Sequence, residues 1–192
     1  METITHLSRP ELEAGMDHIR QSPKDQGLVK LIVRRPQENE REVLEEAELT
    51  VESGLVGDNW EGRGSRHSSD GSANLETQIT VMNARLIDLI AGSPDRWPLA
   101  GDQLYVDMDL GVENLPPGTR LSIGSALLEV SAAPHTGCKK FSARFGVEAM
   151  KFVNSQEGKQ LHLRGINTRV IQSGNIRVGD VVRKVSAGYR ER

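Results

Sequence analysis

The chain has 192 residues, a formal net charge of −3 and one cysteine, Cys138. A chain of this length can bury a core without disulfides, and a lone cysteine excludes an internal disulfide, which favours a reducing, cytoplasmic location. Mild acidity, 4% aromatic residues and the absence of any long apolar run argue against nucleic-acid binding, a secretion signal or a membrane span, so we expect neither a nucleic-acid nor a membrane partner.

The first part of the chain predicts a helix, then strands, then a long loop. Residues 8–20 predict a helix, because they open with a capping box and a proline in the first turn. Residues 28–35 predict a strand, whereas residues 38–49 fit either a helix or a strand. The polar segment 59–77 predicts a loop, and loops of this length in compact domains are usually functional or disordered.

The middle of the chain continues with strands around one capped helix. Residues 78–82 predict a strand, and residues 83–91 predict a helix that starts at an asparagine and ends before a glycine. Residues 101–110 alternate apolar and polar side chains, which predicts a half-buried strand. Residues 119–132 contain two strand-like runs joined by Gly-Ser, which is typical of a hairpin.

The last part predicts one helix and two or three strands. Phe141, Phe145, Ala149 and Phe152 recur at helical spacing, so they are expected on one buried face. Most connections are too short for crossovers between parallel strands. We therefore predict a β-rich α+β fold with mostly antiparallel strands that close into a barrel.

Three Gly-Asp dipeptides, at 57–58, 101–102 and 179–180, stand at or near the start of strand-like runs. Their unequal spacing argues against a sequence repeat. We interpret them as turns.

The environment of Cys138 suggests a chemical role for its thiol. Gly137 allows a tight turn, and the helical pattern that follows places the sulfur at or just before a helix N-terminus. Lys139, Lys140 and His135 are expected to add positive charge, and such surroundings favour the reactive thiolate. The alternative is that Cys138 is a small buried hydrophobic residue.

Basic residues elsewhere suggest a site for an anion. Arg63, Arg66 and His67 lie in the glycine-marked sequence GRGSRHSS, which is either a phosphate-binding loop or a solvated one. Residues 37–61 are strongly acidic, whereas residues 139–192 carry an excess of Lys and Arg. This asymmetry indicates a local basic site for a small anionic molecule or, alternatively, two solvated faces.

Four stretches in this order resemble the MOSC domain, the C-terminal domain family of molybdenum-cofactor sulfurases. They are SGLVGD, GDQLYVDM, LPPGTRLSIGSALLEVSAAPHTGCKKF and LRGINTRVIQSGNIRVGDVV. The resemblance covers residues 28–185 and implies a stand-alone, barrel-like MOSC domain. Residues 1–27 would then form a helical extension and residues 186–192 a C-terminal tail.

The resemblance also implies a cofactor and a ligand for it. In stand-alone relatives with reductase activity, a cysteine at the position of Cys138 ligates the molybdenum of a molybdenum–pterin cofactor. The cations expected around the pterin phosphate are Arg63, Arg66, Lys139, Lys140 and Arg164. The sulfurases carry a pyridoxal-phosphate domain that this chain has no room for, so no pyridoxal-phosphate site is expected.

Three functions are compatible with these features. The first is a molybdenum-cofactor-binding enzyme or reductase component, which would need an external electron donor because the chain has no cysteine set for an iron–sulfur cluster. The second is a sulfur carrier with a persulfide on Cys138, supplied by a sulfur donor protein. The third is a non-catalytic binding module in which the cysteine is structural.

Overall fold

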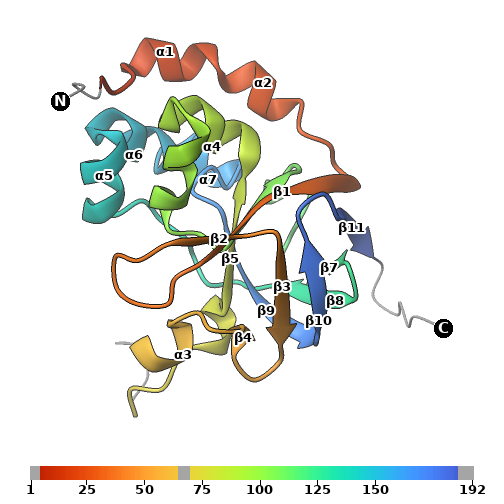
Figure 1. Cartoon of the computed structure of the whole chain (residues 1–192). Coiled ribbons are helices and arrows are strands. Elements are labelled where there is room, and N and C mark those ends of the chain that lie inside the picture. Colours follow the sequence, from red (N-terminus) through yellow and green to blue (C-terminus); the bar gives the residue numbers. More distant parts are fainter. Residues whose placement is uncertain (1–4, 65–69, 186–192) are drawn as a thin grey trace.

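The computed structural model describes residues 5–64 and 70–185, and its centre is a closed barrel of seven strands (Figure 1). In order around the barrel these are β1 (Gln26–Arg34), β11 (Val181–Val185), β7 (Arg120–Ile123), β8 (Ala126–Val130), β9 (Ile166–Gln172), β5 (Ile79–Asn83) and β6 (Leu104–Asp107), which pairs with β1 again. All these pairs are antiparallel except β5–β6, which is parallel. The predicted β-rich, mostly antiparallel barrel is therefore confirmed.

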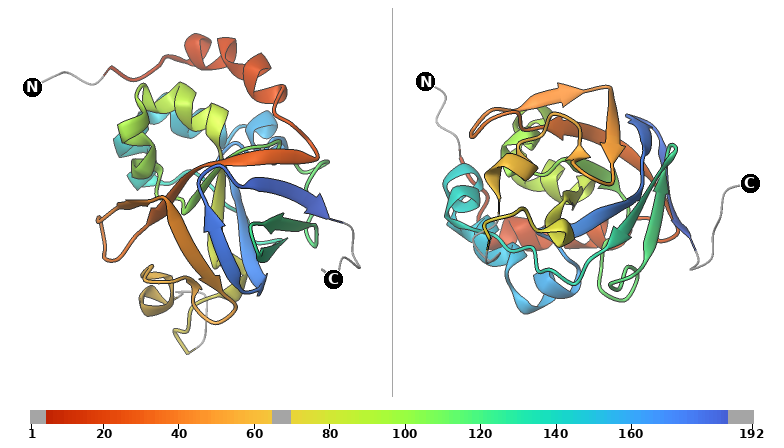
Figure 2. Two further views of the ribbon diagram at one scale, coloured as in Figure 1. Left: turned by 45° about the vertical axis from the view of Figure 1, so that its right-hand side comes forward. Right: turned by 90° about the horizontal axis from the view of Figure 1, so that it is seen from below.

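Two short additions extend the barrel. β2 (Glu42–Leu44) pairs with β1, and a separate sheet has the order β10 (Gly174–Arg177), β3 (Glu46–Thr50), β4 (Gly54–Leu55). Leu49, Leu55 and Ile176 of this small sheet belong to the same aliphatic core as the barrel interior, so the sheet covers part of the barrel (Figure 2). The ambiguous segment 38–49 thus forms strands.

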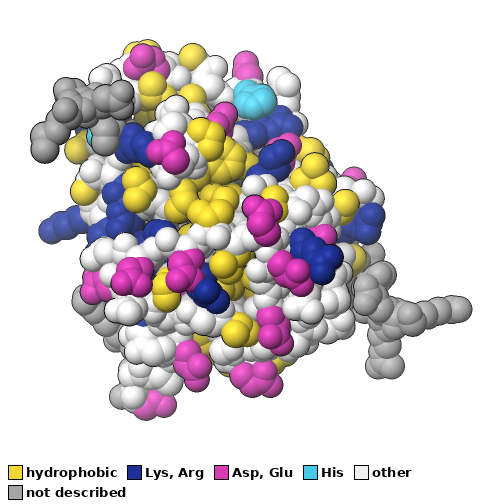
Figure 3. Space-filling view, in the orientation of Figure 1, with side chains coloured by type: hydrophobic (Ala, Val, Ile, Leu, Met, Phe, Trp, Pro, Cys, Tyr) yellow, Lys and Arg dark blue, Asp and Glu magenta, His cyan; other side chains and the backbone are white. Residues whose placement is uncertain are grey.

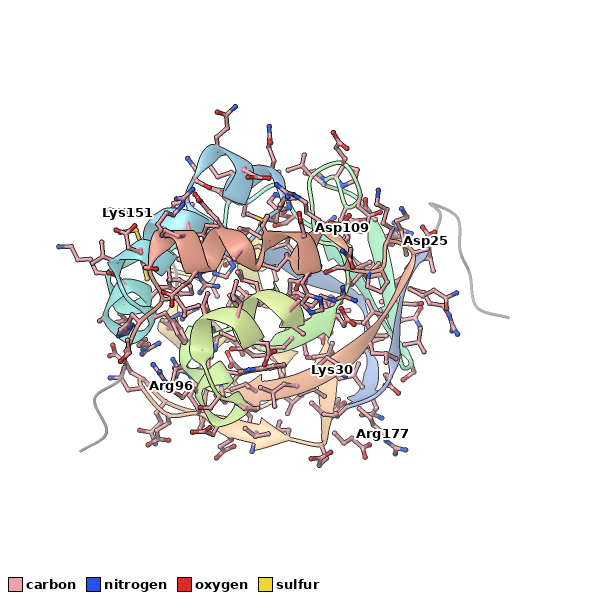
Figure 4. All side chains as sticks on the ribbon, turned by 90° about the horizontal axis from the view of Figure 1, so that it is seen from above. Asp25, Lys30, Arg96, Asp109, Lys151 and Arg177 are labelled. Carbon is pink, nitrogen blue, oxygen red and sulfur yellow. The ribbon has the colours of Figure 1, made fainter. Side chains whose placement is uncertain are left out.

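Helices form a layer on the other side of the barrel (Figures 1 and 4). They are α1 (Arg9–Ala14), α2 (Met16–Arg20), α4 (Ala84–Ala91), the 3-10 helix η2 (Pro94–Ala100), α5 (Lys139–Phe145), α6 (Val147–Val153) and α7 (Gln156–Gln160). Figure 4 shows α1 and α2 lying across this layer, and α1 contacts α6 while α2 contacts α4. The four residues predicted to share a buried face, Phe141, Phe145, Ala149 and Phe152, are buried in this second core.

Glycines divide two of the predicted helices, and one predicted strand is more buried than expected. The helix over 8–20 keeps its capping box but is interrupted at Gly15. The helix after Cys138 is interrupted at Gly146, whose φ is 93° and whose Cα leaves no room for a side chain beside His6. The expectation that residues 101–110 form a half-buried strand is wrong, because Tyr105 packs into the helical core while its neighbours fill the barrel.

The segment 59–77 is only partly a loop. It contains the short helix α3 (Trp60–Arg63) and the 3-10 turn η1 (Leu75–Thr77), and Trp60 is buried. Among the residues that the structure describes, no helix is long and apolar enough to cross a membrane.

Candidate functional site

A cleft with a volume of about 920 Å3 lies where the barrel meets the helical layer. Its walls come from the loop after β1, from α3, from the turn between η2 and β6, from α5 and from the segments that precede α5 and β9. The charged or nucleophilic residues on these walls are Arg35, Glu38, Arg41, Arg63, His135, Cys138, Lys140, Arg144 and Arg164. Figure 3 shows Lys and Arg side chains gathered at the left edge of one face, at the height of α5 in Figure 1, with Asp and Glu side chains below them.

The end of η2 orients four of these arginines. The last carbonyls of a helix have no partner within the helix, so they accept hydrogen bonds from elsewhere. Here Arg41 donates to Pro98 O over 3.2 Å and Arg144 to Leu99 O over 2.7 Å. Arg164 donates to Ala100 O over 3.1 Å and Arg35 to Gly101 O over 2.9 Å. Residues far apart in the sequence thus meet at one turn.

Two of the four arginines are held by buried carboxylates. Arg35 donates from Nε and Nη2 to the two oxygens of Asp58 at 2.9 and 2.7 Å, and Arg164 Nη1 donates to Asp102 Oδ2 at 2.7 Å. The arginine side chains are 8% exposed and the carboxylates are fully buried. Both aspartates belong to Gly-Asp dipeptides, so these dipeptides position cleft residues as well as forming turns.

The other two of these four arginines, Arg41 and Arg144, have no carboxylate partner within residues 5–64 and 70–185. The same is true of Arg63, which also lines the cleft. Burial lowers the pKa of Arg41, and the nearby Arg144 lowers it further; burial and Arg35 lower the pKa of Arg63. A methyl group on Gly101 would lie 3.5 Å from Arg41 Nη2 and 3.9 Å from Arg144 Nη1, so two guanidinium groups flank this glycine. Such uncompensated charge suits a phosphate or another anion.

Lys140 contributes less uncompensated charge than the arginines. Its Nζ donates to Glu38 Oε1 over 2.6 Å, and this hydrogen bond lowers the pKa of the exposed Glu38 carboxyl. Because both side chains are largely exposed, we expect the pair to open at little cost.

His135 lies at the inner wall of the cleft, beside the Asp102–Arg164 pair. Its Nδ1 is 3.6 Å from Asp102 Oδ1, and neither atom has a hydrogen-bond partner among the described residues; the same holds for Arg164 Nε. Burial, reinforced by Arg164 and opposed by Asp102, lowers the pKa of His135 to about 3. The imidazole is therefore uncharged at neutral pH and does not supply the positive charge expected from the sequence.

Cys138 is the N-cap residue of α5, which confirms its predicted place at a helix start. Its side chain is exposed at the cleft, so the alternative of a buried hydrophobic residue is wrong. The turn before it is fixed by Asn154, whose side chain accepts from Gly137 N over 2.9 Å and donates to Gly137 O over 3.0 Å.

The structure brings most of the predicted site residues together. Arg63, His135, Cys138, Lys140 and Arg164 line the cleft. Lys139 is not on its walls and instead lines, with Cys138, a separate shallow depression beside α5 and α6. Arg66 and His67 lie outside the described residues.

Sequence reasoning missed Arg35, Arg41 and Arg144, and it missed the role of Asp58 and Asp102 in holding cleft arginines. The only sequence signal was the repeated Gly-Asp pair. No group of three or more His, Cys, Asp or Glu residues able to hold a metal ion occurs in the described part of the chain.

One comparison with known proteins shows the family of the chain, and another shows solved structures with a similar fold. A profile of the MOSC domain matches residues 74–183, which is more than half of the chain. The YuaD protein of Bacillus subtilis has a similar structure, with a TM-score of 0.58 and 18% identity over 82% of this chain and 94% of that one. YiiM of Escherichia coli has a TM-score of 0.52 and 21% identity over 83% of this chain and 70% of that one. A search of curated proteins gave no match.

Proposed function

The chain belongs to the MOSC domain family, which is generally linked to the molybdenum cofactor, and from this premise we propose that it binds that cofactor in the arginine-lined cleft. The observation that carries the proposal is that an exposed thiol lines the same cavity as three arginines that have no carboxylate partner among the described residues. Thiolates suit soft metals, and guanidinium groups suit phosphate. The two ends of a phosphate-bearing metal cofactor would therefore each find a partner.

The residues of the cleft fit a metal that is already bound to a cofactor rather than a free metal ion. A lone cysteine without a surrounding set of metal ligands does not hold a free metal ion, but it can complete the coordination of a metal that arrives with other ligands. Cys138 would be that protein ligand, and Arg41, Arg63 and Arg144 would hold the phosphate. When bound, the cofactor would supply two-electron redox chemistry, with electrons from an external donor.

His135 would act on the polar atoms of the bound group. Nδ1 of its neutral ring and Asp102 Oδ1 are buried polar atoms with no partner in the described part of the chain, and such atoms are costly unless a ligand or water engages them. We therefore propose that a hydrogen-bonding group of the ligand satisfies this end of the cleft.

A second candidate function is sulfur transfer, with a persulfide on Cys138. The observation that favours it is the exposure of the thiol, which a sulfur donor protein could reach directly. In that case the arginines would bind the anionic acceptor of the sulfur.

Native mass spectrometry of the protein from a host that makes the molybdenum cofactor tests both functions. We expect a bound species of pterin plus metal, lost in Cys138→Ser and reduced in Arg144→Gln. The matched control is Arg177→Gln, because the Arg177 side chain is 67% exposed on β10 and does not line the cleft (Figure 4).

Each other result would redirect the assignment. One extra labile sulfur atom without metal, lost in Cys138→Ser, would favour the sulfur carrier. A bare mass for every variant, also after addition of fresh cofactor, would contradict both functions and leave a non-catalytic binding module.

A further inference from the structure

A second cavity, with a volume of about 430 Å3, lies next to the cleft. Pro134, His135, Arg164 and Asn167 line both cavities, so these residues form the partition between them. The remaining walls come from the loop after β6, from the segment between β8 and α5, from α6 and α7, and from the start of β9. The volume falls within the range of about 300–1,000 Å3 that is usual for small-molecule sites.

The lining of this second cavity is mainly apolar. Its apolar lining residues include Val112, Pro117, Ala132, Val153 and Ile166, and no carboxylate from the described part of the chain lines it. Within residues 5–64 and 70–185, the only charged residues on its walls are cations, namely Lys159 and the carboxylate-paired Arg164. A positively charged ligand would therefore be repelled, whereas an uncharged, mostly apolar molecule would gain from the burial of its apolar surface.

Most polar groups of the lining are already engaged. The amide of Asn167 donates to Ala133 O and Pro134 O over 3.1 and 3.2 Å, and His162 Nδ1 is 2.7 Å from Leu110 O. On the partition, in contrast, His135 Nδ1 and Arg164 Nε have no partner among the described residues. A ligand that enters this cavity therefore finds the neutral imidazole of His135 as an uncharged hydrogen-bonding group, beside the carboxylate-paired Arg164.

The backbone beside the partition is held in an unusual conformation. His162 has φ of 47° and Gly165 has φ of 103°, so both residues on either side of Leu163–Arg164 lie in the left-handed region. A left-handed non-glycine residue is uncommon, and such strain gathers at functional sites. Here Gly165 N donates to His162 O over 2.7 Å, and this tight turn directs Arg164 into the partition. The backbone conformation thus supports a defined partition, and this observation does not depend on the volume of the cavity.

We propose that the second cavity binds a small, uncharged, mostly apolar molecule whose single hydrogen-bonding group meets His135. Binding of this molecule does not depend on the cofactor. That the second cavity is the substrate site of the cleft rests on the proposed function, because only then does a redox group lie on the other side of the partition. His135 would then be the residue that both ligands contact.

Binding can be measured on the cofactor-free protein with a matched pair of probes. Benzyl alcohol is uncharged, and benzylamine has the same shape but is a cation at pH 7. By saturation-transfer NMR and amide shift mapping we expect saturable binding of the alcohol, with Kd on the order of 1 mM, and at least tenfold weaker binding of the amine. Shifts should centre on the side-chain amide of Asn167 and the backbone of His162.

Substitutions locate the site. Ala132 is exposed at the cavity, so Ala132→Trp should fold normally and lower the affinity for benzyl alcohol at least tenfold. Ala14→Trp is the matched control, since Ala14 is exposed at the end of α1 and lines neither cavity. His162→Gly, which keeps the left-handed conformation without a side chain, should shift the affinity at least threefold.

Two results would overturn the proposal. One is non-saturating or scattered shifts in the wild-type protein, and the other is equal affinity in Ala132→Trp and Ala14→Trp. Failure of this proposal can be distinguished from failure of the cofactor assignment, because the probe experiment contains no cofactor and the mass-spectrometric experiment contains no probe.

Discussion

The arginines of the cleft are of two kinds, and the difference lies in what holds them. Arg35 and Arg164 are buried against carboxylates, whereas Arg41 and Arg144 rest on backbone carbonyls and keep their charge uncompensated. Buried pairs are costly to break from one side. Uncompensated cations instead repel one another until an anion arrives. We therefore infer that the paired arginines form the scaffold of the cleft and that the unpaired ones bind.

The largest expected effect is the loss of a buried carboxylate. Asp102→Ala leaves Arg164 as an unpaired buried charge, so the free energy of unfolding should fall by about 3–5 kcal/mol in urea denaturation. The matched control is Asp107→Ala, because Asp107 pairs with Arg85 at 2.7 Å but is 29% exposed. This control should cost about 1 kcal/mol or less. Equal losses in both variants would remove the distinction between scaffold and binding arginines.

The pH dependence of stability tests the same scaffold through His135. Its pKa is about 3 in the folded chain and 6.5 ordinarily. Between these two values His135 is therefore protonated in the unfolded chain but unprotonated in the folded chain. Stability should therefore fall as the pH drops from 6.5 towards 3, by up to about 1.4 kcal/mol per pH unit. Urea denaturation at pH 7, 5.5 and 4.5 should show a shallower fall in His135→Asn than in the wild type. Parallel curves would contradict the assignment.

Gly101 contacts both kinds of arginine. Arg35 donates a hydrogen bond to its carbonyl oxygen, and the guanidinium groups of Arg41 and Arg144 lie near its Cα. With φ of 88°, Gly101→Ala should cost about 1–2 kcal/mol and also weaken anion binding. Gly92→Ala is the control for the backbone term alone, since Gly92 has φ of 75° and open space around it. Calorimetric titration with pyrophosphate should separate the two variants. Unchanged affinity in Gly101→Ala would place the anion elsewhere.

The smallest expected effect on stability belongs to the binding arginines. Arg144→Gln should change the free energy of unfolding by less than about 0.5 kcal/mol, because it removes a repulsion from Arg41 together with one hydrogen bond. Its affinity for pyrophosphate should nevertheless fall at least tenfold, and added salt should weaken the remaining binding. Arg177→Gln should leave both quantities unchanged. A large loss of stability without loss of binding would reverse the roles of the two kinds of arginine.

Local features of the fold could be predicted from the sequence because their causes are local. Asn83 does cap α4, with its side chain accepting from Arg85 N and Leu86 N, and residues 119–132 do form a hairpin. The parallel β5–β6 pair and the small sheet were not predictable, since strand partners far apart in the sequence leave no periodic signal. The extra helix α7 was also missed, because its four polar residues and one glycine show no apolar periodicity.

The candidate site was predictable in part for the same reason. Cys138 could be found because its turn, its helix start and its neighbours are adjacent in the sequence. Arg41 and Arg144 could not, because their significance arises only where both reach the carbonyl groups at the end of η2. The domain boundaries, 28–185 with an extension and a tail, stay a prediction; β1 begins at Gln26, and the profile match begins at residue 74.

The pairing of β1 with β11 also has a consequence for biosynthesis. Leu28 lies opposite Val181, so the strands that close the barrel come from the two ends of the described chain. All the residues between β1 and β11 must be synthesised before this pair can form, and non-local pairing of this kind makes folding slow. Until then one edge of β1 lacks its partner strand. Unpaired strand edges of this kind make a nascent chain prone to aggregation and to binding by chaperones.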